Sequence, residues 1–281
     1  MELKDQITDA RHLEGVPFTM LAPLVARANA ATLVPQLRFS DEMAQAVLAK
    51  VTYNQALMPR DRGTMVGNAA RAERFDRKIE AFLQAHPGAT VLQLGVGLDT
   101  RKFRLRHCEA QWIALDLQEV MALRERLIPD PQERRVVADL RRDEWIDRVF
   151  ESALPEALFV VAEGLFYYLD TPTVHRVVQT ISERFMGTGC AVELFFDYYH
   201  PYFLRKGAQK AVERAKTRLT WGLKDPRELC PELRSLEFVG VEELGSVVPL
   251  AIRLYSAMFR LCALGDRPYG LASYRWNTRL V

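Results

Sequence analysis

A short glycine turn between an apolar run and a helical segment is the most constraining feature of this 281-residue chain. The apolar run is Val91–Leu94, the turn is Gly95-Val96-Gly97, and residues 98–107 have a helical pattern. This order predicts a buried strand that passes through the glycines into a helix, whose first backbone N–H groups face an anionic or polar ligand. The chain is therefore expected to form an α/β fold with a ligand site at this turn.

An acidic residue follows the next apolar run. The run Trp112–Leu115 ends at Asp116, about 20 residues beyond the glycines, where a carboxylate at a strand tip accepts hydrogen bonds from a ribose diol. The third glycine of the dinucleotide fingerprint is missing, because Thr100 stands where that glycine would bring the helix close to a pyrophosphate. Together these features favour a nucleoside cofactor without pyrophosphate over NAD.

Strand and helix patterns alternate from Thr90 onward, which predicts a parallel sheet with right-handed crossovers. The first five strands are predicted at 91–95, 112–116, 134–138, 158–163 and 190–196. The helices between them are predicted at 98–107, 118–127, 141–152 and 172–186, the last with Thr171 as its cap. Two further strands, at 235–241 and 271–277 around a helix at 247–264, would complete the sheet.

Residues 1–70 have no strong strand pattern and are expected to be helical. One helix is predicted to open near Pro17, and Ser40 is expected to cap another. The apolar face of the first helix consists of Leu21, Leu24, Val25 and Ala28. A third amphipathic helix is predicted to stop at His86-Pro87-Gly88.

Composition excludes several classes of protein. The net charge is only +2 and no basic tract occurs, so a nucleic-acid partner is not expected. No apolar run approaches the roughly 18 residues that span a bilayer, and the charged first residues predict no signal peptide. The four cysteines are widely spaced and no metal-ligand cluster is visible, which predicts reduced thiols, a cytoplasmic protein and no metal. The oligomeric state stays open, with a homo-oligomer compatible with the sequence.

Several local sequences resemble motifs of the leucine carboxyl methyltransferase family. They occur in the family's order at Leu94–Leu105, at Val137–Arg141 followed by Trp145, and at Ala162–Leu169. Near the start, Glu14–Pro17 and Ala26–Ala28 resemble the bacterial branch of the family, the tetracenomycin-type polyketide O-methyltransferases.

The resemblance implies a class I methyltransferase fold: a Rossmann-like, seven-stranded, mostly parallel sheet with helices on both faces. It also implies S-adenosylmethionine (SAM) as the methyl donor. On this basis the chain is one domain with a helical lid (1–70), a cofactor-binding core (71–197), a substrate-facing insertion after the fifth strand (198–232) and a segment that completes the sheet (233–281).

The family's cofactor residues carry over to the glycine turn and the strand ends. Gly95 and Gly97 would let the backbone approach the methionine part of SAM, and Arg71 would pair with its carboxylate. Glu163 would lie near the methionyl amine, and Asp116 would hold the ribose hydroxyls.

The adenine would be bound by Asp139, whose carboxylate faces the exocyclic amine, and by Leu140, which lies against the ring. The chain departs from the family at Leu117-Gln118-Glu119, because a proline is common there. Asp116 and Asp139 could each instead cap a following helix, and Arg71 could belong to an ordinary charged helix face.

The acceptor site is expected in the aromatic segment. Tyr198, Tyr199 and His200, together with Tyr168 and Trp221, would line a wall for a flat apolar acceptor, or else pack the lid against the core. A carboxylate acceptor, with a pKa of about 4, needs only orientation, whereas a phenol, with a pKa of about 10, profits from a general base. His200 is the candidate for that base, and no catalytic residue is assigned beyond it.

The sequence thus predicts a SAM-dependent O-methyltransferase that acts on a carboxylate or hydroxyl of a small, aromatic, polyketide-like molecule. Three alternatives stay open: methylation of a protein C-terminal carboxylate, an NAD(P)-dependent oxidoreductase, and a SAM-binding protein without catalysis. Thr100 argues against the oxidoreductase.

Overall fold

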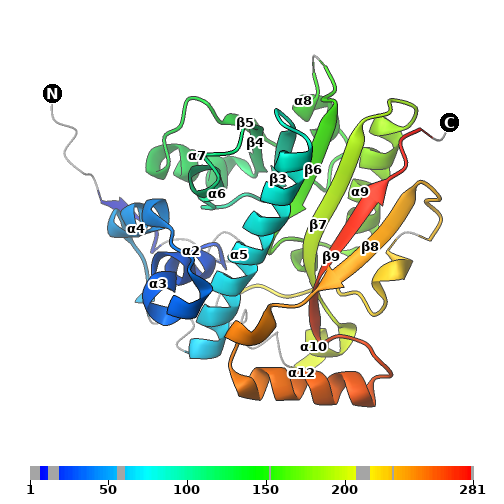
Figure 1. Cartoon of the computed structure of the whole chain (residues 1–281). Helices are drawn as coiled ribbons and strands as arrows, with labels where there is room; N and C mark the ends of the chain where they lie inside the picture. The colour runs from blue at the N-terminus through cyan, green and yellow to red at the C-terminus, as the bar shows by residue number, and fades with distance from the viewer. Residues whose placement is uncertain are drawn as a thin grey trace, which may run out of the picture.

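A seven-stranded sheet forms the centre of the computed structural model, which describes residues 7–11, 19–55, 61–151, 153–206, 216–229 and 231–279. The strand order is β5-β4-β3-β6-β7-β9-β8, in which β9 alone runs antiparallel to both of its neighbours (Figure 1). The strands are β3 (Thr90–Leu94), β4 (Gln111–Asp116), β5 (Arg134–Val137), β6 (Ala157–Ala162), β7 (Ala191–Tyr199), β8 (Leu236–Glu242) and β9 (Tyr269–Trp276).

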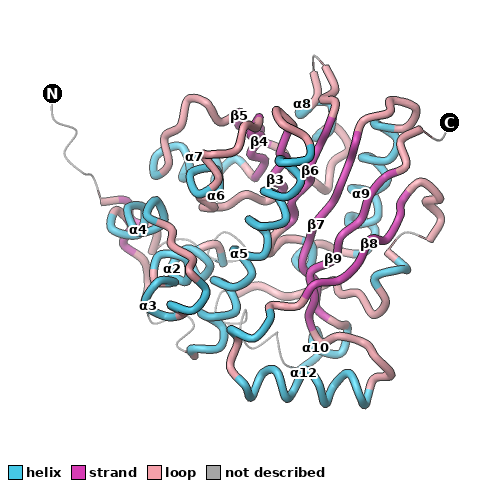
Figure 2. Tube along the Cα trace, viewed as in Figure 1, coloured by secondary structure: helices cyan, strands magenta, loops and turns pink. Residues whose placement is uncertain are grey.

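Helices cover both faces of this sheet (Figure 2). All residues of β3 and β6 are buried, as is typical of parallel strands with helices on each side. Helix α5 packs on one face, and α8 and α9 pack on the other. The helices of the core are α5 (Arg62–Ala85), α6 (Arg101–Arg104), α7 (Gln118–Leu127), α8 (Trp145–Val149) and α9 (Thr171–Phe185).

The sequence predicted the strands well and the helix limits less well. The predicted helices at 98–107 and 141–152 contain only the short α6 and α8. Asp170, not Thr171, caps α9, because its side chain accepts a hydrogen bond from the Thr173 N–H. The third amphipathic helix stops before His86, as predicted.

The fifth strand is longer than predicted, which moves the start of the insertion. Tyr198 and Tyr199 belong to β7, because the antiparallel strand β9 supplies them with partners at Gly270 and Tyr269. The elements after β7 are α10 (Pro201–Lys206), the 3₁₀ turns Pro226–Glu228 and Gly245–Val247, and α12 (Leu250–Cys262). Residues 207–215 of the predicted insertion lie outside the described residues.

The N-terminal region is mostly helical, as expected, but also holds a short pair of parallel strands. These strands are β1 (Thr8–Asp9) and β2 (Val51–Thr52). The helices are α2 (Leu21–Ala28), α3 (Ala30–Leu33), the 3₁₀ turn Pro35–Leu37 and α4 (Glu42–Ala49). Pro17 and the Glu14–Pro17 motif lie outside the described residues. No helix in the described ranges has both the length and the apolar character to cross a membrane.

Buried charges fix the N-terminal helices to the core. Asp41 caps α4 in place of Ser40, since its Oδ1 accepts from the Ala44 N–H at 2.9 Å. Its other oxygen accepts from Arg27 of α2 at 3.1 Å and also from two groups of the core, the Thr100 hydroxyl and the Arg104 guanidinium. One buried carboxylate therefore joins two N-terminal helices to the segment that follows the glycine turn.

We predict that Asp41→Asn lowers the free energy of unfolding by about 3–5 kcal/mol, because it removes the buried carboxylate that pairs with Arg27 and one of the three that surround Arg104. Urea denaturation measures this change. Asp9→Asn is the matched control, since Asp9 forms an exposed ion pair with Arg11 and should leave stability unchanged. Equal stability of Asp41→Asn and wild type would show that Asp41 does not fix the N-terminal helices to the core.

The difference in unfolding free energy between wild type and Asp41→Asn should be smaller at low pH. Burial alone would raise the pKa of Asp41, but Arg104, Arg27 and the Thr100 hydroxyl outweigh burial and lower it. A carboxylate with a depressed folded-state pKa stabilises the protein above its unfolded pKa and loses this contribution as pH falls through the folded value. The stability gap should therefore narrow below about pH 4.

Candidate functional site

The glycine turn lies at the carboxyl edge of the sheet, where the strand order reverses between β3 and β6. Open α/β sheets bind their ligands at such a point. Gly95 and Gly97 have φ values of 61° and 53°, which L side chains rarely adopt. A Cβ at Gly95 would lie 2.6 Å from a Leu165 methyl carbon, and one at Gly97 would lie 3.2 Å from the Met20 Cβ. Both positions therefore require glycine.

Asp116 is held in a fixed orientation at the tip of β4. Its Oδ2 accepts from the Gly97 N–H at 2.8 Å, and its Oδ1 accepts from the Leu117 N–H at 2.8 Å. Burial raises the pKa of this carboxyl, although the two backbone donors oppose the shift. An ionised carboxylate has about four acceptor positions, so two remain for further donors such as ribose hydroxyls.

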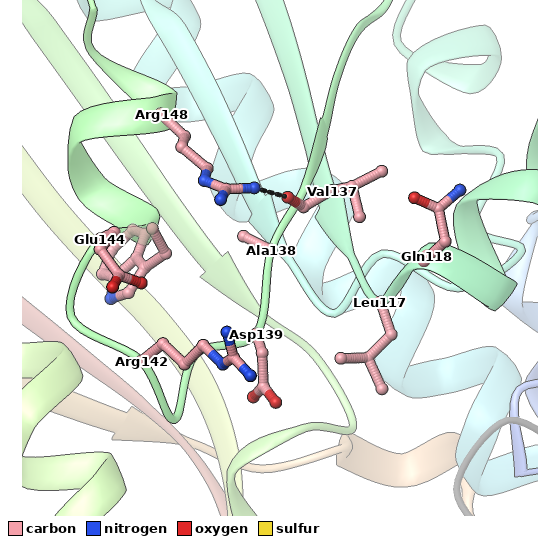
Figure 3. A pocket seen from close by; sticks show the side chains of 9 residues that line it. Leu117, Gln118, Val137, Ala138, Asp139, Arg142, Glu144 and Arg148 are labelled. Carbon is pink, nitrogen blue, oxygen red and sulfur yellow. Dashed lines mark hydrogen bonds between the residues drawn. The ribbon is translucent and has the colours of Figure 1, made fainter.

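A cavity of about 330 Å³ lies beside Asp116 between the ends of β4 and β5. Figure 3 shows its wall, in which a guanidinium N–H of Arg148 donates to the Val137 carbonyl at 3.2 Å. The lining residues are Leu117, Gln118, Val137, Ala138, Asp139, Arg142, Glu144, Trp145 and Arg148.

The cavity combines apolar wall surface with the carboxylates of Asp139 and Glu144 and two arginines. Hydrogen bonds from Arg141 to Asp139 lower the pKa of this carboxyl, and its side chain is 26% exposed. Leu117 and Ala138 supply flat apolar surface in the same wall. A purine with an exocyclic amine fits this set of groups. Leu140 is buried in the core and does not line the cavity, so its contact with an adenine ring stays a prediction.

Arg71, in the middle of α5, meets Glu163, which directly follows β6. The Arg71 Nε donates to Glu163 at 2.9 Å, and the Glu163 side chain is only 9% exposed. Burial alone would raise the pKa of Glu163, but the positive charges of Arg101 and Arg71 outweigh this effect and lower the pKa. The structure thus brings together the two residues predicted for the charged amino-acid end of SAM, already paired with each other.

Asp197 belongs to the same cluster and was missed by the sequence analysis. It is fully buried in β7, where it accepts from Arg71 at 3.0 Å, from the Gly164 N–H at 2.6 Å and from the Tyr269 hydroxyl at 2.8 Å. The signal was present in the sequence, since a lone acid follows an apolar run in a predicted strand. Asp197 therefore holds both Arg71 and the turn after β6 in place.

Two of the aromatic residues predicted to line the acceptor wall lie elsewhere. Tyr198 is 1% exposed and Trp221 is 3% exposed, and both belong to the main core cluster. Trp221 packs against Phe166 and Phe196, with ring centroids 5.9 Å apart in each case. This corrects the expectation for both residues, because neither has free surface for a ligand.

Tyr168 and Tyr199 remain half-buried at the carboxyl edge. The ring of Tyr167 lies 4.9 Å from Tyr168 and 5.2 Å from Tyr199, and the Tyr167 hydroxyl accepts from Arg71 at 3.1 Å. Burial raises the pKa of Tyr199 to about 12. These phenols therefore keep their protons at neutral pH and can act only as hydrogen-bonding and apolar groups.

His200 follows β7 directly, and protein groups lie beside both of its ring nitrogens. Its Nδ1 accepts from the Tyr202 N–H at 3.1 Å, which requires the proton of the neutral ring to sit on Nε2. Nε2 is buried without a hydrogen-bond partner and lies 3.4 Å from the Asp266 carboxylate. One ring nitrogen is thus hydrogen-bonded and the other is buried, so neither is presented to an acceptor.

One group of metal-type ligands lies away from the site. Glu80, His107 and Cys108 bring their ligand atoms within 4.8 Å of one another near the amino ends of β3 and β4, on the opposite edge of the sheet. His107 and Glu80 already form an ion pair at 2.7 Å.

Comparison with known proteins identifies the family. The model of the family described as leucine carboxyl methyltransferase matches residues 19–182. The tetracenomycin polyketide synthesis O-methyltransferase TcmP of Streptomyces glaucescens is 31% identical over 229 residues, which cover 80% of this chain and 82% of that protein. The chain belongs to the leucine carboxyl methyltransferase family.

A second curated relative has the same type of name. The S-adenosyl-L-methionine-dependent methyltransferase dpfgK of Gibberella zeae is 30% identical over 246 residues, which cover 80% of this chain and 81% of that protein. A solved structure of a SAM-dependent methyltransferase from Anabaena variabilis covers 75% of this chain and 86% of its own, with 12% identity and a TM-score of 0.49.

Family membership and the sheet order confirm the predicted fold, enzyme class and cofactor: the protein is a class I, SAM-dependent methyltransferase. The oxidoreductase alternative is thereby excluded. Which residues hold the cofactor remains a prediction, and the geometry above makes it testable.

We predict that Asp116→Ala weakens binding of S-adenosylhomocysteine, the demethylated product of SAM, by about 1–3 kcal/mol, or roughly 5- to 150-fold. The loss reflects the missing partner of the ribose hydroxyls, and calorimetric titration measures it. Glu119→Ala removes an exposed acid from the first turn of α7 and should bind normally. Unchanged affinity of Asp116→Ala would overturn the ribose assignment.

Arg71→Lys should weaken binding of the amino-acid end of the ligand without affecting binding of its adenosine end. Lysine keeps the charge but loses the planar fork of donors that bridges two carboxylates. We expect about tenfold weaker binding of S-adenosylhomocysteine and unchanged binding of adenosine, which lacks the amino-acid end. Equal losses for both ligands would place Arg71 outside the amino-acid subsite.

Proposed function

We propose that this methyltransferase transfers the methyl group of SAM to an oxygen of a small, aromatic, polyketide-like acceptor. The observation that carries the proposal is the 31% identity to TcmP over 80% of the chain. The half-buried tyrosines beside Arg71 support it, because they offer apolar ring surface and hydroxyl donors at the edge where the cofactor residues gather.

The cofactor is proposed to lie across this edge from the cavity to the buried charges. Asp139 and the apolar wall of Leu117 would hold the adenine, and Asp116 would hold the ribose. Arg71 and Glu163 would hold the methionyl carboxylate and ammonium, each exchanging part of its present ion pair for a partner on the ligand. Bound SAM supplies a methyl group on a positively charged sulfur.

The residues of the chain position the acceptor and exclude water. The acceptor oxygen must approach the methyl carbon in line with the leaving sulfur, to about 3 Å. A carbon–oxygen bond forms as the carbon–sulfur bond breaks, and the two opposite charges of a carboxylate and a sulfonium are neutralised. A buried site with fixed dipoles favours such a step.

A carboxylate is the acceptor group that the side chains favour. Tyr199 and its neighbours keep their protons at neutral pH. The Nδ1 of His200 is hydrogen-bonded and its Nε2 is buried. An acceptor that arrives ionised needs no base, whereas a phenol does. The product would then be a methyl ester.

We further infer that the protein works in the cytoplasm on a small molecule rather than on nucleic acid. The support is the near-neutral charge and the absence of disulfides among Cys108, Cys190 and Cys262, the cysteines that the structure describes.

The direct test is transfer of an isotopically labelled methyl group from SAM to a panel of acceptors. The panel contains aromatic carboxylic acids, phenols of the same ring size and peptides that end in leucine. Methyl esters lose the label in alkali, whereas methyl ethers retain it. Alkali-labile label on the small acids supports the proposal, stable label on the phenols indicates ether formation, and label on the peptides alone would replace the small molecule with a protein C-terminus.

We predict that His200→Ala changes turnover of a carboxylate acceptor by less than about threefold, because no proton has to be removed. Steady-state kinetics measures this, with His175→Ala on the outer side of α9 as the control. A loss of 100-fold or more, with normal affinity for S-adenosylhomocysteine, would instead establish His200 as a general base.

A further inference from the structure

A glutamate, a histidine and a cysteine meet at the amino edge of the sheet. Glu80 lies in the last two turns of α5, close to where the chain enters β3 (Figure 1), and His107 and Cys108 lie between α6 and β4. One ligand atom from each residue lies within 4.8 Å of the other two. The proposed cofactor site is at the carboxyl ends of the same strands, so this Glu80 cluster takes no part in it.

Packing and backbone hydrogen bonds hold the two segments that carry the Glu80 cluster. Ile79 of α5 and Leu105 are buried in one core cluster, and Cys108 packs against it. The Cys108 N–H donates to the Leu105 carbonyl at 2.9 Å, and the Glu109 carbonyl accepts from the Gly88 N–H at 3.1 Å. The three side chains therefore project from a fixed backbone, as a metal site requires if its ligands are to lie together before the metal arrives.

The three donors of the Glu80 cluster are the types that zinc prefers. A thiolate sulfur binds Zn²⁺ at about 2.3 Å, and an imidazole nitrogen or a carboxylate oxygen binds it at about 2.0 Å. Ligand atoms on such a tetrahedral centre lie roughly 3.3–3.8 Å apart. The His107 side chain is 58% exposed, so it can rotate to close the remaining distance. Calcium and magnesium take oxygen ligands and do not match a set that contains sulfur.

Two simpler roles for these residues leave part of the Glu80 cluster unexplained. The His107 Nε2 lies 2.7 Å from a Glu80 carboxylate oxygen, but a surface pair of this kind contributes little to stability and does not involve Cys108. Burial and the negative charge of Glu80 raise the pKa of the Cys108 thiol, which does not favour a reactive nucleophile at neutral pH. A divalent cation is the one partner that all three groups can share.

We propose that Glu80, His107 and Cys108 bind one zinc ion, with water as the fourth ligand. The ion joins the end of α5 to the connection between α6 and β4, and it stabilises the folded chain because the unfolded chain does not hold the three ligands together. The role is structural, since the ion lies at the edge of the sheet opposite the cofactor site. Glu80 precedes His107 by 27 residues, so no ligand motif is visible in the sequence, and the proposal revises the expectation that the protein has no metal.

Titration of the chelator-treated protein with Co²⁺, a coloured substitute for Zn²⁺, tests the ligand set. We expect one equivalent per chain to produce a thiolate-to-cobalt charge-transfer band in the near ultraviolet, and one equivalent of Zn²⁺ to abolish it. Cys108→Ser should lose this band. Cys262→Ser is the matched control and should keep it, because it removes an exposed thiol on α12, away from the cluster.

Competition with a chromophoric chelator measures the zinc affinity. We expect at least about tenfold weaker binding for His107→Ala and for Glu80→Gln, and unchanged binding for the control His175→Ala on α9. Zinc at about 100 times its dissociation constant should raise the thermal unfolding midpoint of the wild-type chain by about 5 °C and leave that of Cys108→Ser unchanged. The affinity for S-adenosylhomocysteine should be the same with and without zinc.

The variants have a clear reading because Glu80, His107 and Cys108 all keep some exposure to solvent. Circular dichroism of each metal-free variant should match that of the metal-free wild type. The absence of a charge-transfer band in the wild-type chain would overturn the proposal. Equal zinc affinity of the wild type, Cys108→Ser and His107→Ala would show an adventitious ion only, and would overturn it as well. A band that Cys262→Ser removes would place the metal on α12 instead.

Discussion

Buried arginines that bridge pairs of carboxylates hold this protein together at its functional edge. Arg101 contacts Asp76, Asp99 and Glu163, which ties α5, the glycine turn and the end of β6 into one unit. Removal of one partner from such a cluster leaves a buried charge without compensation, so the whole set depends on each member. The other bridging residues are Arg71, Arg104, Arg27, Asp41 and Asp197.

This network explains how a cofactor site can be formed before the cofactor arrives. The charges that would recognise a methionyl ammonium and carboxylate are already ionised and oriented, because Arg71 and Glu163 neutralise each other. A ligand that carries both charges can exchange with this pair without leaving net charge buried. The cavity beside Asp139 would bind the adenine end of the cofactor, where recognition of a flat ring depends on shape.

The sequence predicted the parts of the fold that depend on local pattern. The parallel strands were placed to within two residues, except at the end of β7. The signal was clearest for β3 and β6, whose apolar runs are continuous and which glycine turns follow. The extension of β7 through Tyr199 depends on pairing with β9, far along the chain. The core positions of Tyr198 and Trp221 depend on long-range packing of the same kind.

The edge formed by β3, β4 and β6 is proposed to bind SAM. The most direct measurement of this is calorimetric titration of the wild-type protein with S-adenosylhomocysteine and, separately, with NADH. We expect saturable one-to-one binding of S-adenosylhomocysteine and no heat of binding with NADH. Binding of NADH alone, or of neither ligand, would contradict it.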